Sequence, residues 1–304
     1  NYPANSGIQR VVRGLARALQ STGIPVIPVK WDNTSYSFYS PAEKEIMHLA
    51  AWNGPDPTGF SQSAMSGDES GSWLLVPELT SNLGDTGLVE VVQKAKSIGL
   101  CTAIVFYDSL PYKLAQLYPP EATMAHTDYM KKLMNFDCVL PISNASSVDL
   151  QAFLFQHTER LVNIGKKLNP VILPGEFREH PRVAAYEEPE TATIRILCVS
   201  TIEPRKNHLL LLESFDKISR EKSVDVDLVL VGQCAYPELE KKVNGFLERN
   251  RRIHWLRHVD DATLSKEYSR CHFTVYPSMD EGFGLPVLES LWYARPCICR
   301  NTGA

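Results

Sequence analysis

Residues 278–289 read Ser-Met-Asp-Glu-Gly-Phe-Gly-Leu-Pro-Val-Leu-Glu and directly follow an apolar run of strand length at Phe273–Tyr276. Gly282 and Gly284 allow the backbone to approach a ligand closely or to take a positive φ. Pro286 suits the first turn of a helix, where its missing N–H costs nothing. The stretch therefore predicts a strand, a glycine-rich turn and a helix, whose free N–H groups would favour an anion such as a diphosphate.

The same stretch carries two carboxylates. Glu281 lies in the predicted loop and Glu289 about one turn into the helix, so both side chains can face one pocket. There they would accept hydrogen bonds from sugar or ribose hydroxyls. The alternative, which the residues alone leave open, is a glycine-rich turn with ordinary surface glutamates.

A second turn of this kind reads Val-Ser-Thr-Ile-Glu-Pro-Arg-Lys-Asn over residues 199–207. Arg205 and Lys206 place two cations beside the positive end of a predicted helix, which is unfavourable unless an anion binds there. A phosphate would resolve this conflict, because Arg offers a bidentate fork and Lys a point charge. A solvated basic turn is the other interpretation.

Strands and helices alternate on both sides of these turns. Continuous apolar runs are typical of parallel strands buried on both faces, and the alternation indicates an α/β fold. In the second half we predict strands at 194–199, 226–231, 253–256, 273–276 and 296–299, and helices at 207–220, 236–247, 260–268 and 286–293. In the first half we predict helices over 8–19 and 88–98 and strands at 73–76, 102–106 and 138–140.

The 304 residues, 44% apolar and 22% charged, are about two globular domains' worth of chain. The proline-containing, aperiodic stretch 173–193 has the composition of a linker. We therefore predict two Rossmann-like domains, 1–175 and 194–304, joined by a linker at 176–193, with parallel sheets that face a central cleft. That cleft is the expected ligand site. The Gly/Ser-rich stretch 58–72 is the expected mobile loop.

Charge and cysteine content exclude some classes. The net charge of −4 argues against nucleic-acid binding, and no apolar run approaches the ~20 residues of a membrane span. The seven cysteines are scattered without a C-x-x-C pair, which favours free, mostly buried thiols in a reducing compartment. We expect a cytoplasmic protein. Both ends look cut, so we also expect part of a longer protein.

Residues 194–304 closely resemble the nucleotide-sugar-binding domain of the retaining glycosyltransferases of family 4, the glycosyl transferases group 1, which have the GT-B fold. The Glu-Pro-Arg-Lys-Asn turn and the Glu-x7-Glu stretch, with Glu281 and Glu289, occur in family order and spacing. In the first half, three stretches resemble the family less tightly: residues 7–13, 106–111 and 140–146.

The resemblance implies a role for each matching residue. Arg205 and Lys206 would hold the donor diphosphate, and Gly7 would let the first loop approach it. Glu289 would bind the ribose hydroxyls. Glu281 would hold hydroxyls of the transferred sugar, together with the backbone amides of Gly282, Phe283, Gly284 and Leu285. Asp108 occupies the acceptor-side position, and Glu281 and Asp108 are the residues expected at the reacting centre.

Two positions depart from the family pattern. Ser200-Thr201 stands where many members have Gly-Arg, so Arg205 takes over the role of a phosphate-binding arginine. Tyr107 stands where many members have a His before the acceptor-side Asp. The second domain also lacks the segment after Ala304 that completes it in the family, so we expect it to be incomplete.

The resemblance implies a retaining glycosyltransferase that moves a sugar, mannose by our prediction, from a GDP- or UDP-sugar to a glycan or lipid-linked acceptor. Surface polysaccharide assembly at the inner face of the membrane is the expected setting. No cofactor or metal is expected. A front-face displacement is preferred over a covalent intermediate on Glu281. The alternatives are a non-catalytic nucleotide-sugar-binding module of a larger synthase and a GT-B phosphorylase or epimerase.

One helical face carries Arg10, Arg13 and Arg17. Such a face could meet an anionic membrane surface in a peripheral contact. A solvated face is the commoner explanation of such a pattern.

Overall fold

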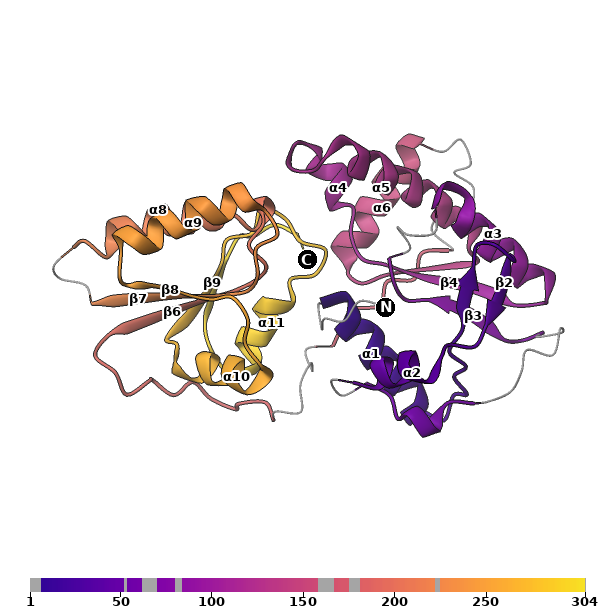
Figure 1. The fold of residues 1–304 in the computed structure, drawn as a ribbon, viewed down its shortest axis with the longest axis horizontal. Helices are drawn as coiled ribbons and strands as arrows, with labels where there is room; N and C mark the ends of the chain where they lie inside the picture. Colours follow the sequence, from indigo (N-terminus) through magenta and orange to yellow (C-terminus); the bar gives the residue numbers. More distant parts are fainter. Residues whose placement is uncertain are drawn as a thin grey trace. The chain divides into compact units, whose positions relative to one another are not determined.

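The computed structural model describes residues 7–51, 54–61, 70–79, 84–157, 167–174, 181–221 and 225–303. The chain divides into two compact units, Asn1–Glu179 and His180–Ala304 (Figure 1). The boundary between the units falls inside the stretch 176–193. Most of the expected mobile loop, residues 62–69, lies outside the described residues.

The described part of the first unit contains a parallel sheet of order β3-β4-β5, formed by Trp73–Val76, Cys101–Phe106 and Cys138–Pro141. These are the three predicted strands. Its helices are α1 Gly7–Ser21, α2 Glu43–Ala50, α3 Gly84–Ser97, α4 Leu110–Lys113, α5 Pro120–Lys132 and α6 Asn144–His157. Short 3-10 turns lie at Pro57–Gly59, Ala115–Leu117 and Leu133–Asn135. Buried residues of β4, such as Ile104 and Phe106, pack with Leu150 and Phe153 of α6 in one apolar core.

The first unit also contains an antiparallel hairpin that periodicity did not predict. Strands β1 Lys30–Asp32 and β2 Ser37–Tyr39 pair across a tight turn. Three residues are too few to show an apolar period, so such strands carry little sequence signal. The hairpin contributes Trp31 and Phe38 to a small apolar cluster against β3 and α3.

The second unit is a five-stranded parallel sheet of order β10-β9-β6-β7-β8. Its strands are β6 Ile194–Val199, β7 Val226–Val231, β8 Ile253–Leu256, β9 Phe273–Tyr276 and β10 Cys297–Cys299. Its helices are α8 His208–Ile218, α9 Pro237–Arg249, α10 Asp261–Arg270 and α11 Leu285–Trp292. All five strands and four helices match the predicted positions to within two residues at each end.

The strand order of this sheet fixes the position of the two motifs. Chain progression runs outward from β6 through β7 to β8 on one side and from β9 to β10 on the other. Helices α8 and α9 cover one face, whereas α10 and α11 cover the other (Figure 1). The order reverses between β6 and β9, and open α/β sheets bind ligands outside the carboxyl ends of the strands at such a switch point. The turns that follow β6 and β9 both lie there.

Residues predicted as linker lie against the second unit. The Val183 amide donates to the Trp292 carbonyl at 3.0 Å. Arg295, which is 7% exposed, donates to the Glu187 carbonyl at 2.6 Å and lies over the Tyr186 ring. The described residues 181–193 of this stretch are thus joined to the second unit by hydrogen bonds, although most of them are exposed.

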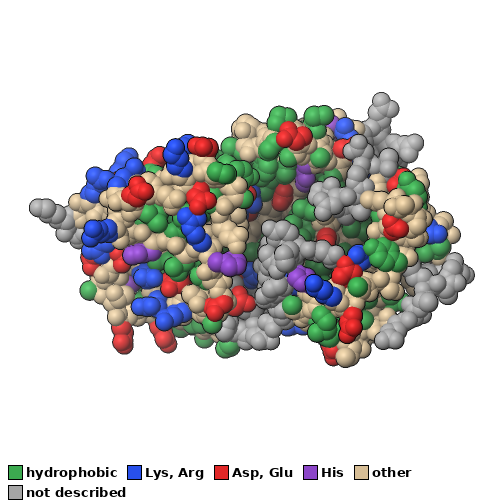
Figure 2. All heavy atoms as spheres, viewed as in Figure 1, with side chains coloured by type: hydrophobic (Ala, Val, Ile, Leu, Met, Phe, Trp, Pro, Cys, Tyr) green, Lys and Arg blue, Asp and Glu red, His purple; other side chains and the backbone are tan. Residues whose placement is uncertain are grey.

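Two surface expectations need correction. Arg13 is 4% exposed, with Nη2 3.5 Å from the His48 carbonyl oxygen, so the three arginines of α1 do not form one solvated face. Of the seven free cysteines, Cys198 and Cys271 are buried, whereas the other five are partly or fully exposed. On the face shown in Figure 2, basic and acidic side chains are interspersed over the second unit. No helix in the described part of the chain is long and apolar enough to cross a bilayer.

Gly232, directly after β7, offers a test of the switch-point backbone. Its φ is +142°, and a Cβ there would lie 2.2 Å from the Ser200 carbonyl oxygen. Gly232→Ala should therefore lower the free energy of unfolding by about 2 kcal/mol or more. Gly245→Ala in α9 is the matched control, because a Cβ there meets nothing within 4 Å and Ala favours the helix. Equal denaturant midpoints for the two variants would refute the close approach.

Candidate active site

The turn after β6 places two cations before a helix. Residues Pro204–Lys206 form a 3-10 turn, and Asn207 takes a left-handed conformation with φ of 57° before α8 begins at His208. The Met279 amide, in the turn after β9, donates to the Arg205 carbonyl at 2.8 Å. This backbone bond joins the two motif turns, so their side chains meet at the switch point.

Glu281 lies at the centre of this meeting. Its Oε1 atom accepts hydrogen bonds from Arg205 Nη1 at 2.8 Å, Lys206 Nζ at 2.5 Å and the Tyr276 hydroxyl at 2.9 Å. The Ser278 hydroxyl donates to the same oxygen. The Lys206 ammonium also donates to the Tyr276 hydroxyl and lies over its ring, 4.8 Å from the centroid.

All four of these donors converge on Oε1 and none of them on Oε2. The Glu281 side chain is 14% exposed. A carboxylate oxygen carries lone pairs that accept further hydrogen bonds. The geometry thus holds Oε1 of Glu281 against the protein, and these four donors do not engage Oε2.

The charges of this cluster balance. Arg205 pairs through Nη2 with Glu203 at 2.9 Å and through Nη1 with Glu281. Two cations and two carboxylates therefore sum to zero. Burial alone would raise the pKa of Glu281, but the charges of Lys206 and Arg205 outweigh it and hold that pKa below its usual value. The protein's own carboxylates thus balance the charge of the two cations at this helix start.

Glu289 occupies a different environment. It lies in α11 and is 3% exposed, and its Oε2 atom accepts a hydrogen bond from the Tyr268 hydroxyl at 2.9 Å. Tyr268 is itself 1% exposed, and its ring stacks on Tyr293 with the centroids 4.8 Å apart. Of the two glutamates, Glu281 therefore lies nearer the surface and Glu289 inside the unit.

The glycine-rich loop has the backbone that its sequence predicts. Gly284 has a φ of +88° and precedes α11, which begins at Leu285 with Pro286 in its first turn. The backbone after β10 packs closely against this loop: a Cβ on Gly303 would lie 2.8 Å from the Glu281 carbonyl oxygen. Gly282 and Phe283 complete the loop between Glu281 and the helix.

Asp108 and Gly7 belong to the first unit. Asp108 follows β4, and its Oδ1 accepts from the Leu110 amide at 3.0 Å, which fixes the start of α4. His126 of α5, which sequence reasoning missed, donates from Nε2 to the Asp108 carbonyl at 3.0 Å. Burial lowers the pKa of His126, so its imidazole stays neutral. Gly7 is the first residue of α1.

Tyr107, which replaces the family's histidine, turns away from this position. Its side chain is buried, and the hydroxyl donates to the Pro77 carbonyl at 2.7 Å. It therefore helps to hold the segment after β3 against β4. An imidazole is nevertheless present beside Asp108, from a different element.

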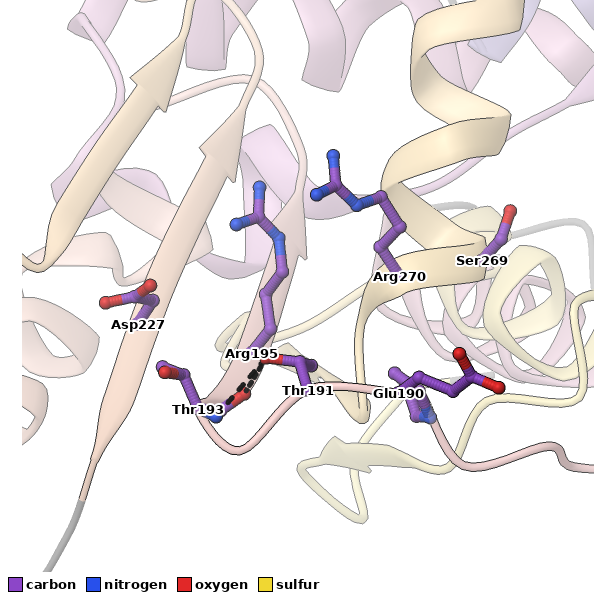
Figure 3. A pocket seen from close by; sticks show the side chains of 8 residues that line it. Glu190, Thr191, Thr193, Arg195, Asp227, Ser269 and Arg270 are labelled. Carbon is purple, nitrogen blue, oxygen red and sulfur yellow. Dashed lines mark hydrogen bonds between the residues drawn. The ribbon is translucent and has the colours of Figure 1, made fainter.

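A pocket of about 240 Å³ lies elsewhere on the second unit (Figure 3). Arg195 and Asp227, near the amino ends of β6 and β7, line it together with Ser269 and Arg270 at the end of α10. It therefore lies at the opposite edge of the sheet from Glu281. Because ligands of such sheets bind at the carboxyl edge, we assign the site to the switch point and not to this pocket.

The switch-point geometry and the fold define a class. Residues 184–304 match the model of the family Glycosyl transferases group 1. The whole chain superposes on the lipopolysaccharide outer core galactosyltransferase WaaB with a TM-score of 0.58, at 14% identity, covering 100% of this chain and 79% of that one. The chain has the GT-B fold, and residues 184–304 of its second unit are similar to the glycosyl transferases group 1 family, as the motifs predicted.

Among curated proteins, the chain is 24% identical over 318 residues to the serotype-specific mannosyltransferase WbdA of Escherichia coli. That match covers 99% of this chain and 36% of the relative. The O-antigen chain mannosyltransferase B of Escherichia coli is 34% identical over 108 residues, which cover 34% of this chain and 28% of the relative. The matched stretches thus span little more than a third of the first relative and 28% of the second.

Proposed function

We propose that the chain is a retaining glycosyltransferase of family 4 that transfers mannose from GDP-mannose to a glycan or lipid-linked acceptor in bacterial surface polysaccharide assembly. The observation that carries this proposal is the Glu281–Arg205–Lys206 cluster at the switch point of a group 1 domain. Mannose is favoured over other sugars because the relatives above are mannosyltransferases by name.

The donor's parts fit the cluster by charge. The diphosphate would bind Arg205 and Lys206, competing with Glu281 Oε1 for their N–H groups. The sugar hydroxyls would donate to Glu281 Oε2 and meet the amides of Gly282–Leu285. Glu289 would bind the ribose, while Gly7 approaches the diphosphate and Asp108 the sugar or acceptor from the first unit.

The chemistry then rests on charge stabilisation of the leaving group. As the bond from the anomeric carbon to the phosphate oxygen breaks, negative charge develops on the diphosphate, and Arg205 and Lys206 stabilise it. The acceptor oxygen attacks the same face, and its proton passes to the departing phosphate oxygen. Oε1 of Glu281 pairs with two cations. A carboxylate held in this way is better suited to orient sugar hydroxyls than to attack the anomeric carbon as a nucleophile.

For the setting, we propose the cytoplasmic face of the membrane with a peripheral contact to it. A lipid-linked acceptor would be presented there, and seven free thiols suit a reducing compartment. The second candidate function is a non-catalytic nucleotide-sugar-binding module. This candidate predicts nucleotide binding without turnover.

The phosphate assignment is tested by nucleotide binding. In a thermal-shift and calorimetric panel of GDP, UDP, ADP and their sugars, we expect GDP and GDP-mannose to stabilise the protein most. Arg205→Ala and Lys206→Ala should each raise the Kd for GDP at least about tenfold, which is the loss of affinity expected for one charge-assisted hydrogen bond. Arg220→Ala is the control, because its side chain is 66% exposed and pairs with Asp216, four residues earlier in the chain.

Two outcomes would contradict these assignments. Full affinity for nucleotide in both cation variants would refute the diphosphate site. Absence of stabilisation by any nucleotide would refute nucleotide-sugar binding as a whole. Binding without transfer to any glycan acceptor would instead select the non-catalytic module.

A further inference from the structure

We propose that Tyr276 and Tyr268 are positioning residues, each holding the carboxylate of one glutamate of the Glu281–Glu289 pair in a fixed orientation. The inference rests on the function proposed above for the two carboxylates. It starts from a repeated geometry: Tyr276 to Glu281 and Tyr268 to Glu289 are both hydroxyl-to-carboxylate bonds of 2.9 Å. The two tyrosines come from different elements, the end of β9 and the last turn of α10.

Tyr276 is placed to select between the oxygens of Glu281. It is 4% exposed, and its hydroxyl lies between the Lys206 ammonium, from which it accepts, and Glu281 Oε1, to which it donates. A phenol that both accepts from the cation and donates to the anion fixes the two groups at once. Burial and the charge of Glu281 raise the pKa of Tyr276 well above its usual value, so the hydroxyl keeps its proton.

The consequence for Glu281 is directional. Because Tyr276 joins the other three donors on Oε1, rotation of the carboxylate would break several hydrogen bonds together. Oε2 is thereby held toward the side from which a sugar hydroxyl would come. Tyr276 acts on the sugar only through Glu281, so its loss should alter turnover more than nucleotide affinity.

Tyr268 holds Glu289 from the interior. Its ring is fixed by the parallel stack on Tyr293, with an interplanar angle of 5°, and its hydroxyl reaches Glu289 Oε2. With the ring plane set by packing, the hydroxyl can point in few other directions. Since Glu289 is assigned to the ribose, loss of this bond should alter nucleotide affinity.

The test compares three phenylalanine variants of the full chain. Tyr276→Phe should lower kcat about tenfold and leave the Kd for GDP within about twofold. Tyr268→Phe should instead raise the Kd for GDP about tenfold. Each effect is that expected for the loss of one hydrogen bond to a charged group. Tyr293→Phe is the matched control, because its buried hydroxyl has no hydrogen-bond partner among the described residues. It keeps the ring stack and should change neither quantity.

A second arm needs no substrate. The side-chain carboxyl carbons of isotope-labelled glutamates are followed by NMR as a function of pH, without added nucleotide. The variants Glu281→Gln and Glu289→Gln identify which resonance belongs to which glutamate. Removing a donor from a carboxylate raises its pKa, so Tyr276→Phe should raise the pKa of Glu281 and Tyr268→Phe that of Glu289. Each variant should leave the other glutamate unchanged.

The two arms separate the possible failures. Unchanged titration of both glutamates, or equal effects of all three phenylalanine variants, would overturn the positioning roles. Shifted titrations in a protein that binds no nucleotide would support the positioning roles and refute the proposed function instead.

Discussion

Glu281→Gln should reduce sugar transfer by about a hundredfold to a thousandfold, the range seen when one preorganised polar group is removed from an active site. The substitution keeps the size of the side chain but replaces a carboxylate that pairs with two cations and that, by our proposal, would offer Oε2 to the sugar. Affinity for GDP should be kept or rise, because Arg205 and Lys206 lose an internal competitor for the phosphate.

Single-turnover transfer and calorimetry on the same preparations measure these two quantities. Glu213→Gln is the control, because Glu213 lies exposed on α8 in the same unit. A Glu281→Gln variant that keeps wild-type kcat would exclude Glu281 from the reacting centre. One that loses GDP together with transfer would show that its role is structural.

The second large effect concerns stability. Lys206 is 8% exposed, and its ammonium pairs with Glu281 at 2.5 Å. Glu281→Ala leaves this buried charge without its carboxylate, and we expect a loss of about 3 kcal/mol or more in the free energy of unfolding. The double variant Glu281→Ala/Lys206→Met should recover most of that loss, because it removes both charges. Urea denaturation of the wild type, the two single variants and the double variant measures the coupling free energy between Glu281 and Lys206.

The same pair gives the cluster a pH dependence. The folded-state pKa of Glu281 is held below its reference value of 4.5. Its contribution to stability is therefore present above that reference value and is lost as pH falls through the lower folded-state pKa. As pH falls from neutral, the difference in unfolding free energy between the wild type and Glu281→Ala should stay constant down to that range and then shrink. An advantage that grows with acid would contradict the ion pair.

The second unit was predicted from its sequence almost completely. Apolar runs such as Val226–Val231 are buried on both faces, so their hydrophobicity alone marks the strand. The two turns were also identified, because Gly284 and Pro286 signal a helix start at the position where the structure has one. The first unit was harder, since the short hairpin at residues 30–39 is defined by pairing and by packing against α3, and not by a period of its own.

The partners of the site residues were beyond the sequence. Sequence spacing placed Glu281 and Lys206 in two separate turns, and nothing in it indicated that one oxygen would receive four donors. Tyr276 looked like an ordinary apolar end of a strand, and Tyr268 like a core residue of a helix. The pairing of β9 with β6 brings the turn after β9 next to the turn after β6, which the sequence alone does not show.

The zero net charge of Glu203, Arg205, Lys206 and Glu281 has a consequence for selectivity among anions. An open pair of cations would attract every small anion in solution, including orthophosphate and sulfate. Here an incoming phosphate must displace a carboxylate that is already bonded to both cations. A ligand that also brings hydroxyl groups for the displaced carboxylate offsets this cost, and a bare inorganic ion does not. We therefore expect the site to ignore the abundant ions of the cell and to respond to molecules that join a diphosphate to a sugar.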